Sequence, residues 1–90
     1  MNWRKSRYGR VRNFERTVVA GFNGVADLKL VISGLPGRWH WRVIAILETE
    51  HLGEAARLRD AVRQAEEAAA SVDLDALWLA GPRCAIIWTP

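Results

Sequence analysis

Residues 27–47, DLKLVISGLPGRWHWRVIAIL, contain two strand patterns joined by a turn signal. Apolar and polar residues alternate from Asp27 to Ser33, which is typical of a strand with one buried face. Pro36-Gly37 suits the centre of a type II turn, because proline presets φ and glycine accepts a positive φ. A second strand is expected from Trp39 to Leu47. One face of the two strands is expected to carry Leu28, Leu30, Ile32, Trp39, Trp41, Val43 and Leu47.

The segment that precedes this stretch predicts a second hairpin and a basic arm. Residues Phe14 to Ala20 include a Thr-Val-Val run that favours β structure, and Asn23-Gly24 is a strong signal for a hairpin turn. Residues 1–12 show neither a helical nor a strand period, so they are expected to form an extended or mobile basic arm. The predicted division is therefore an arm, 1–12, and a single α+β domain, 13–90.

The segment that follows predicts helices. Glu48-Thr49-Glu50 is expected to close the strand and open a long amphipathic helix from Leu52 to Val72, whose apolar residues recur three or four positions apart. Asp73 is placed to cap a short second helix, and Arg83 to Thr89 is expected to form a last strand. The fold class predicted is α+β, a small antiparallel sheet of about four strands packed by one long helix. The apolar stripe of that helix consists of Ala55, Leu58, Val62, Ala65, Ala69 and Val72.

Composition places the chain among globular proteins. Ninety residues suffice for one domain, and 50% hydrophobic with 26% charged residues is a folded profile. Cys84 is the only cysteine, so no disulfide can form within the chain, which argues for a reducing compartment. No run approaches the roughly 20 apolar residues of a membrane span, so no membrane partner is expected and a cytoplasmic localisation is predicted.

The second face of the sheet is a candidate contact surface. One long helix can cover only one face, and apolar residues remain on the other. A contiguous apolar patch in water usually marks a contact site, so a partner or a second copy of the chain is expected there as one reading. The alternative is that the arm and the second helix cover it. The residues concerned are Val31, Ile44 and Ile46, with some of Cys84, Ile86 and Trp88.

Positive charge concentrates at the N-terminus. The net charge is +3, and residues 1–16 hold six cations against the single carboxylate of Glu15. Such a segment can neutralise several phosphates of a nucleic acid, and the binding would depend steeply on salt. A docking arm for an acidic protein surface and a solubilising tail are the alternatives. The predicted contact residues are Arg4, Lys5, Arg7, Arg10, Arg12 and Arg16.

An acidic cluster with a histidine offers a third, catalytic reading. Glu48, Glu50, His51 and Glu54 fall close together in the sequence, and carboxylates with imidazole perform acid–base work or bind metals. A helix start rich in acidic residues explains the same pattern, since the helix dipole favours it. No second cluster supplies further ligands, so neither a metal nor an enzyme is expected. No Gly-rich phosphate-binding motif occurs, and no cofactor is expected.

Trp39-His40-Trp41-Arg42 mixes aromatic and basic groups, as single-strand nucleic-acid binders do. Trp39 and Trp41 share a face with Val43, however, which favours a place in the core. His40 is expected to face solvent, and Cys84 to be a buried, inert thiol.

A Trp-x-Trp strand, Trp39 to Val43, is followed by an Ala-rich helix, Ala55 to Ala70, with an Ala-Glu-Glu-Ala-Ala segment at 65–69. Over residues 28–72 this order resembles small uncharacterised proteins encoded by phages and prophages, similar in size and build to anti-CRISPR inhibitors. The resemblance implies a non-enzymatic protein that acts stoichiometrically on a protein or nucleoprotein partner. Most such inhibitors are acidic nucleic-acid mimics or compact blockers, so the basic arm departs from the commoner type and argues against DNA mimicry. The alternative is a nucleic-acid binder that uses the arm, either as a monomer or as a homodimer.

Overall fold

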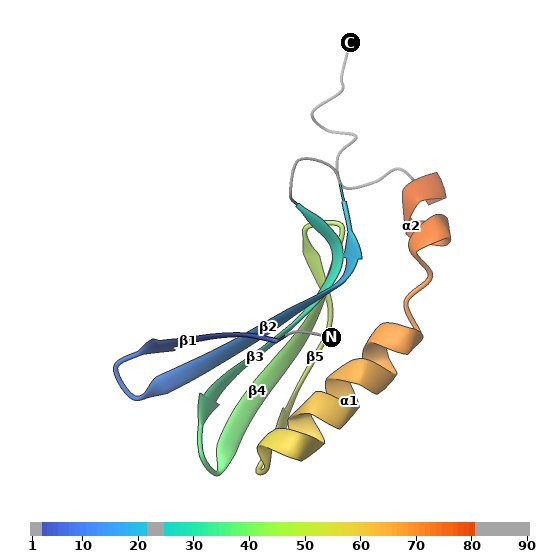
Figure 1. Ribbon diagram of the computed structural model, residues 1–90. Helices are drawn as coiled ribbons and strands as arrows, with labels where there is room; N and C mark the ends of the chain where they lie inside the picture. The colour runs from blue at the N-terminus through green and yellow to red at the C-terminus, as the bar shows by residue number, and fades with distance from the viewer. Residues whose placement is uncertain (1–2, 22–24, 81–90) are drawn as a thin grey trace.

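The computed structural model describes residues 3–21 and 25–80. These residues form an α+β fold in which five antiparallel strands make one sheet in chain order, followed by two helices (Figure 1). The α+β class and the antiparallel sheet confirm the prediction, but two of the five described strands, β1 and β5, were not expected, and the long helix is shorter than expected. The elements are β1 Arg4–Tyr8, β2 Val11–Ala20, β3 Ala26–Leu35, β4 Arg38–Ala45, β5 Glu48–Ala55, α1 Leu58–Ala70 and α2 Leu74–Ala80.

The β3–β4 hairpin is the centre of the sheet. Pro36 and Gly37 form the turn between these strands, and Gly37 has the positive φ, 91°, that the predicted turn requires. Ile32 lies opposite Trp41, and Leu30 lies opposite Val43. The predicted core face is confirmed except for Leu47, which lies in the β4–β5 turn and is 66% exposed. The buried core consists of Leu28, Leu30, Ile32, Trp39, Trp41, Val43, Ala45, Ala61, Ala65 and Ala69.

Helix α1 crosses one face of the sheet and contacts β3, β4 and β5 (Figure 1). Its buried residues are Ala61, Ala65 and Ala69, which recur every four positions and let the helix approach the sheet closely. The indole N–H of Trp41 donates to Gln64 Oε1 at 2.9 Å, so this buried aromatic keeps its polar atom satisfied. Gly53 on β5 leaves room for the same ring, because a Cβ there would lie 2.5 Å from Trp41 Cζ2.

Strand β5 corrects the predicted helix start. Residues 48–55 form a strand instead of the end of one strand and the start of a helix, and α1 begins only at Leu58. The turn that makes this possible is Ile46-Leu47, with φ values of 47° and 70°. Two-residue hairpin turns with positive φ at both positions strongly prefer Asn and Gly, so nothing in the Ile-Leu pair signals a turn. The predicted cap of the second helix is confirmed, since Ala76 N–H donates to Asp73 Oδ1 at 3.0 Å.

The N-terminal arm is also corrected, because residues 4–8 form β1, an edge strand that pairs with β2. In Figure 1 the β1–β2 hairpin extends to the left of the sheet, whereas α1 lies to its right. The predicted hairpin around Asn23-Gly24 agrees with the antiparallel pairing of β2 and β3 on either side of it. Residues 23–24 themselves, and the predicted last strand Arg83 to Thr89, lie outside the described residues.

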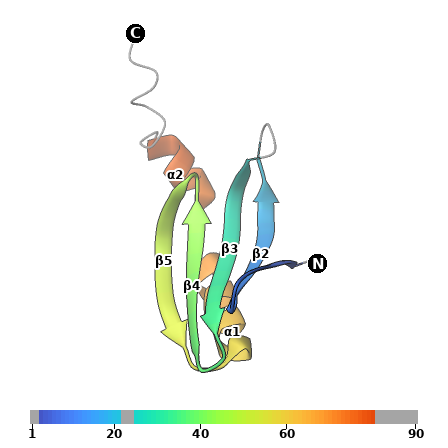
Figure 2. The same cartoon turned by 90° about the vertical axis from the view of Figure 1, so that its left-hand side faces the viewer.

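The opposite face of the sheet is open in the described part of the chain. Figure 2 looks onto this face, and both helices lie behind the sheet. Val31 projects toward this side, yet it is only 5% exposed. It lies between Glu15 and Arg42 in the strand register, and the aliphatic stems of such long side chains can cover a small apolar neighbour.

Candidate functional site

Residues 4–16, here called the basic hairpin, contain the six cations that the sequence indicates as contact residues. Gly9 and Arg10 form the two-residue turn that joins β1 to β2. Gly9 has a φ of 62°, which suits the first central position of a tight hairpin turn and is open to glycine without steric cost. Every residue of β1 is exposed. The hairpin therefore holds its charges on a paired, extended backbone instead of a loose arm.

Strand pairing sorts these cations onto two faces. Lys5 lies opposite Phe14, and Arg7 lies opposite Arg12. Phe14 packs against the core on the α1 side, so Lys5, Arg7 and Arg12 share that side. There they border an open hollow of about 460 Å³ between the basic hairpin and the start of α1. The described residues that line the hollow are Lys5, Ser6, Arg7, Arg12, Phe14 and Leu58, with no carboxylate among them.

The opposed Arg7 and Arg12 are the most unusual feature of the hairpin. Like charges directly opposite on paired strands repel and destabilise the sheet. Among the described residues, neither guanidinium has a carboxylate within ion-pair distance, and the same holds for Lys5 and Arg10. In the described part of the chain, the positive charge on this side is therefore open to solvent or to an anion from outside the chain.

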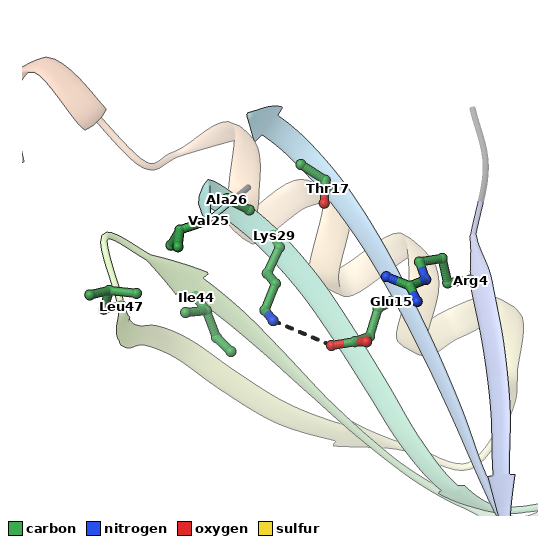
Figure 3. Close-up of a pocket in the computed structure, with 8 residues that line it drawn as sticks. All are labelled: Arg4, Glu15, Thr17, Val25, Ala26, Lys29, Ile44 and Leu47. Atoms are coloured by element: carbon green, nitrogen blue, oxygen red, sulfur yellow. Dashed lines mark hydrogen bonds and ion pairs between the residues drawn. The ribbon is translucent and has the colours of Figure 1, made fainter. Parts of the chain in front are cut away.

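Arg4 lies on the other face of the hairpin, opposite Glu15. It borders a hollow of about 600 Å³ on the open face of the sheet. Figure 3 shows the Arg4 side chain extended toward Glu15, whose Oε1 accepts a 3.3 Å ion-paired hydrogen bond from Lys29 Nζ. Because this hollow contains charges of both signs, it is less suited to a polyanion than the α1 side.

Arg16 differs from the other five predicted contact residues. Its Nη1 donates to Glu66 Oε2 on α1 at 2.7 Å, and the side chain is only 15% exposed. Its Nε is buried without a hydrogen-bond partner in the described structure. Arg16 therefore ties β2 to α1, and it is not available for contact in the way that the sequence suggested.

Two residues of the α1-side hollow, Phe14 and Leu58, do not figure among the predicted contacts. The signal for Phe14 was present in the sequence. Once Gly9-Arg10 is taken as a turn, pairing places Phe14 opposite Lys5. Leu58 reaches the same hollow only because α1 folds back across the sheet, and no local pattern encodes that approach.

The residues of the predicted apolar contact surface that the structure describes are buried or half-buried. Val31 and Ile46 are 5% and 6% exposed, and only Ile44 of the three is half-buried. The large apolar side chains that are exposed near the β4–β5 hairpin are instead Leu47 and Leu52, at 66% and 72%. Cys84, Ile86 and Trp88 lie outside the described residues.

The acidic cluster is divided between the two faces of β5. Glu54 lies 3.0 Å from His40 Nδ1, opposite it on β4, whereas His51 lies opposite Val43 on the core side. Within residues 3–21 and 25–80, no three His, Cys, Asp or Glu side chains gather closely enough to hold a metal ion.

His51 and Glu50 line a shallow hollow of about 250 Å³ together with Ser71 and Asp73. Ser71 Oγ lies 3.5 Å from His51 Nε2, but its hydroxyl donates to Ala68 O at 2.7 Å. That hydrogen bond uses the only proton of the hydroxyl, so His51 is not placed to remove it. This arrangement does not form a nucleophile–base pair.

In the part of the chain that the structure describes, neither α1 nor α2 has the length and apolar character needed to cross a membrane. Comparison with protein-family models, with curated proteins and with solved structures finds no match for this chain.

Proposed function

We propose that this protein is a non-enzymatic binding module that holds the phosphate backbone of a nucleic acid on its basic hairpin. The proposal rests on Arg7 and Arg12, which lie opposite each other and have no ion-pair partner among the described residues. Lys5 lies beside them on the same face. Guanidinium groups bind phosphate oxygens through two parallel hydrogen bonds, which gives both strength and geometry. A phosphate between the two arginines would also relieve their mutual repulsion.

The distribution of charge over the whole chain supports this placement. Residues 1–16 hold six cations and one carboxylate, and the rest of the chain holds seven cations and nine carboxylates. A partner attracted by net charge alone would have no reason to choose the hairpin over other exposed arginines. A partner that needs several cations close together finds them on the hairpin, where five remain without an ion pair in the described residues.

The test compares two triple variants by fluorescence anisotropy with labelled DNA and RNA. The first replaces Arg7, Arg10 and Arg12 with Glu. The matched control replaces with Glu the residues Arg38, Arg42 and Arg59, which are also exposed and without an ion pair among the described residues but lie outside the hairpin. Each Arg-to-Glu substitution lowers the net charge by two, so both variants change the net charge from +3 to about −3. The proposal predicts loss of binding in the first variant, with most of the binding kept in the control.

Salt dependence adds a second readout. If the wild-type protein neutralises about three phosphates, its affinity falls by roughly 40-fold between 50 mM and 200 mM salt. An equal loss of affinity in both triple variants would show that net charge alone governs binding. It would refute the proposal that the hairpin is the binding site. If no nucleic acid binds at low salt but an acidic protein does, the hairpin docks on protein instead.

A nucleoprotein complex presents the same phosphates. The proposal is therefore compatible with the stoichiometric inhibitor of a host-defence complex that the resemblance implies, and that role stays a prediction.

A further inference from the structure

We infer that the α1-side hollow admits the base of an unpaired nucleotide, which makes the protein a binder of single strands in preference to duplexes. This inference rests on the proposed function and adds the form of nucleic acid that the hairpin selects. It is carried by the composition of the hollow, which joins a rim of cations to an apolar wall.

The apolar wall is held in place by the core. Phe14 is half-buried, and its ring centroid lies 6.0 Å from that of Trp39 at an interplanar angle of 57°. Trp39 is itself 4% exposed, so one side of Phe14 is fixed by a buried neighbour. Phe14 also lines the hollow, together with Leu58 from the first turn of α1. An aromatic that is fixed by the core and borders an open hollow is suited to receive a flat apolar group.

The spacing between the cations and the apolar wall suits a nucleotide. Arg7 and Arg12 lie one strand repeat away from the Lys5–Phe14 pair, which is roughly 7 Å along the hairpin. A nucleotide has the same division into a charged phosphate and a flat base, joined by a sugar. The hollow, at about 460 Å³, lies within the range of roughly 300–1,000 Å³ that small-molecule sites occupy.

Strand selection follows from the access that the base needs. In a duplex, each base is stacked on its neighbours and paired, so its face cannot reach an aromatic ring unless the base is flipped out. In a single strand the faces are available, and aromatic side chains beside a cationic groove are the usual platform for them.

The experiment measures binding of an oligothymidylate, of inorganic polyphosphate with the same number of phosphates, and of a DNA duplex, by calorimetry at low salt. The key variant is Phe14→Leu, which keeps an apolar side chain but removes the ring. The matched control is Tyr8→Leu, because Tyr8 is a 74% exposed aromatic on the other face of the same hairpin. Circular dichroism checks that each variant folds.

The inference predicts that Phe14→Leu weakens oligothymidylate binding about 5- to 150-fold, the range for one lost base stack, and leaves polyphosphate binding unchanged. Tyr8→Leu should change neither. If Phe14→Leu fails to fold, intermolecular NOEs between the thymine protons and the Phe14 ring in the wild-type complex give the same answer, and their absence refutes the inference.

Three other outcomes separate the inference from the proposed function. Equal affinity for oligothymidylate and polyphosphate, with no effect of Phe14→Leu, would overturn the base-binding hollow and leave phosphate binding intact. Loss of oligothymidylate binding in Tyr8→Leu alone would move the base to the other face and also overturn it. If none of the three polyanions binds, the proposed function itself fails.

Discussion

The β3–β4–α1 region and the basic hairpin belong to one sheet, yet their side chains obey opposite rules. In the first region, Leu30, Ile32 and Val43 are fully buried, and no polar or charged residue is buried in the described structure. In the second, every residue of β1 is exposed, and Arg7 lies directly opposite another arginine. The β3–β4–α1 region therefore stabilises the fold, whereas the basic hairpin is held in position by that fold.

A small protein tolerates an unfavourable interaction better at its surface than in its core. A domain of this size has a stability of roughly 5–15 kcal/mol, so a repelling pair in the core would be a serious loss. On an edge hairpin in water the repulsion is partly screened and costs little. Local conflicts of this kind are expected at functional sites, which is a further reason to place contact on the hairpin.

The largest expected effect comes from breaking the first region. Ile32→Ala removes three carbons from a side chain that is fully buried between Phe14 and Trp41 in the strand register. We expect it to lower the free energy of unfolding by about 2–5 kcal/mol, measured by urea denaturation. The control in the basic hairpin is Val11→Ala, where the side chain is 41% exposed and the change should be within about 0.5 kcal/mol. Equal losses at both positions would contradict the division.

An intermediate effect tests the turn at the end of β4. Leu47 has a φ of 70° and is 66% exposed, so its side chain gains little from burial while its backbone is strained. Leu47→Gly should raise the free energy of unfolding by on the order of 1 kcal/mol. Leu52→Gly is the matched control, since Leu52 is equally exposed but sits within β5. Glycine there should cost about 0.5–1 kcal/mol, and a loss at both positions would argue against strain in the turn.

The smallest expected effect comes from the like charges that lie opposite each other in the basic hairpin. Arg7→Glu turns the like-charge pair with Arg12 into an opposite-charge pair, so we expect stability to rise by about 0.2–1 kcal/mol at low salt. The gain should vanish near 1 M salt, where charges are screened within about 3 Å. Arg38→Glu makes the same change opposite Leu35 and should leave stability nearly unaltered. A drop in stability for Arg7→Glu would mean that Arg7 has a structural role.

Much of the fold follows from periodicity. The alternation around Leu28–Ile32 and Trp39–Val43 predicted both the strands and the face that packs against the helix, because pleated strands turn alternate side chains to one side. The Asp73 cap was likewise local chemistry. For the site, composition alone identified the cations, and it could not say which of them would be paired. Arg16 is the example, since Glu66 is fifty residues away in the chain.

The path between β4 and α1, and the hollow that depends on it, come from contacts between segments that are distant in the sequence. Ile46 is 6% exposed and its N–H donates to Asp27 O at 3.0 Å, so burial and a hydrogen bond from another strand hold a turn that its own residues disfavour. That turn makes residues 48–55 a strand, returns the chain across the sheet and brings Leu58 to Phe14. Local sequence specifies which residues are apolar, which are basic and where the two kinds alternate. The cost of a positive φ at Ile46 is local, but the contacts that outweigh it are not, and they exist only in the folded chain.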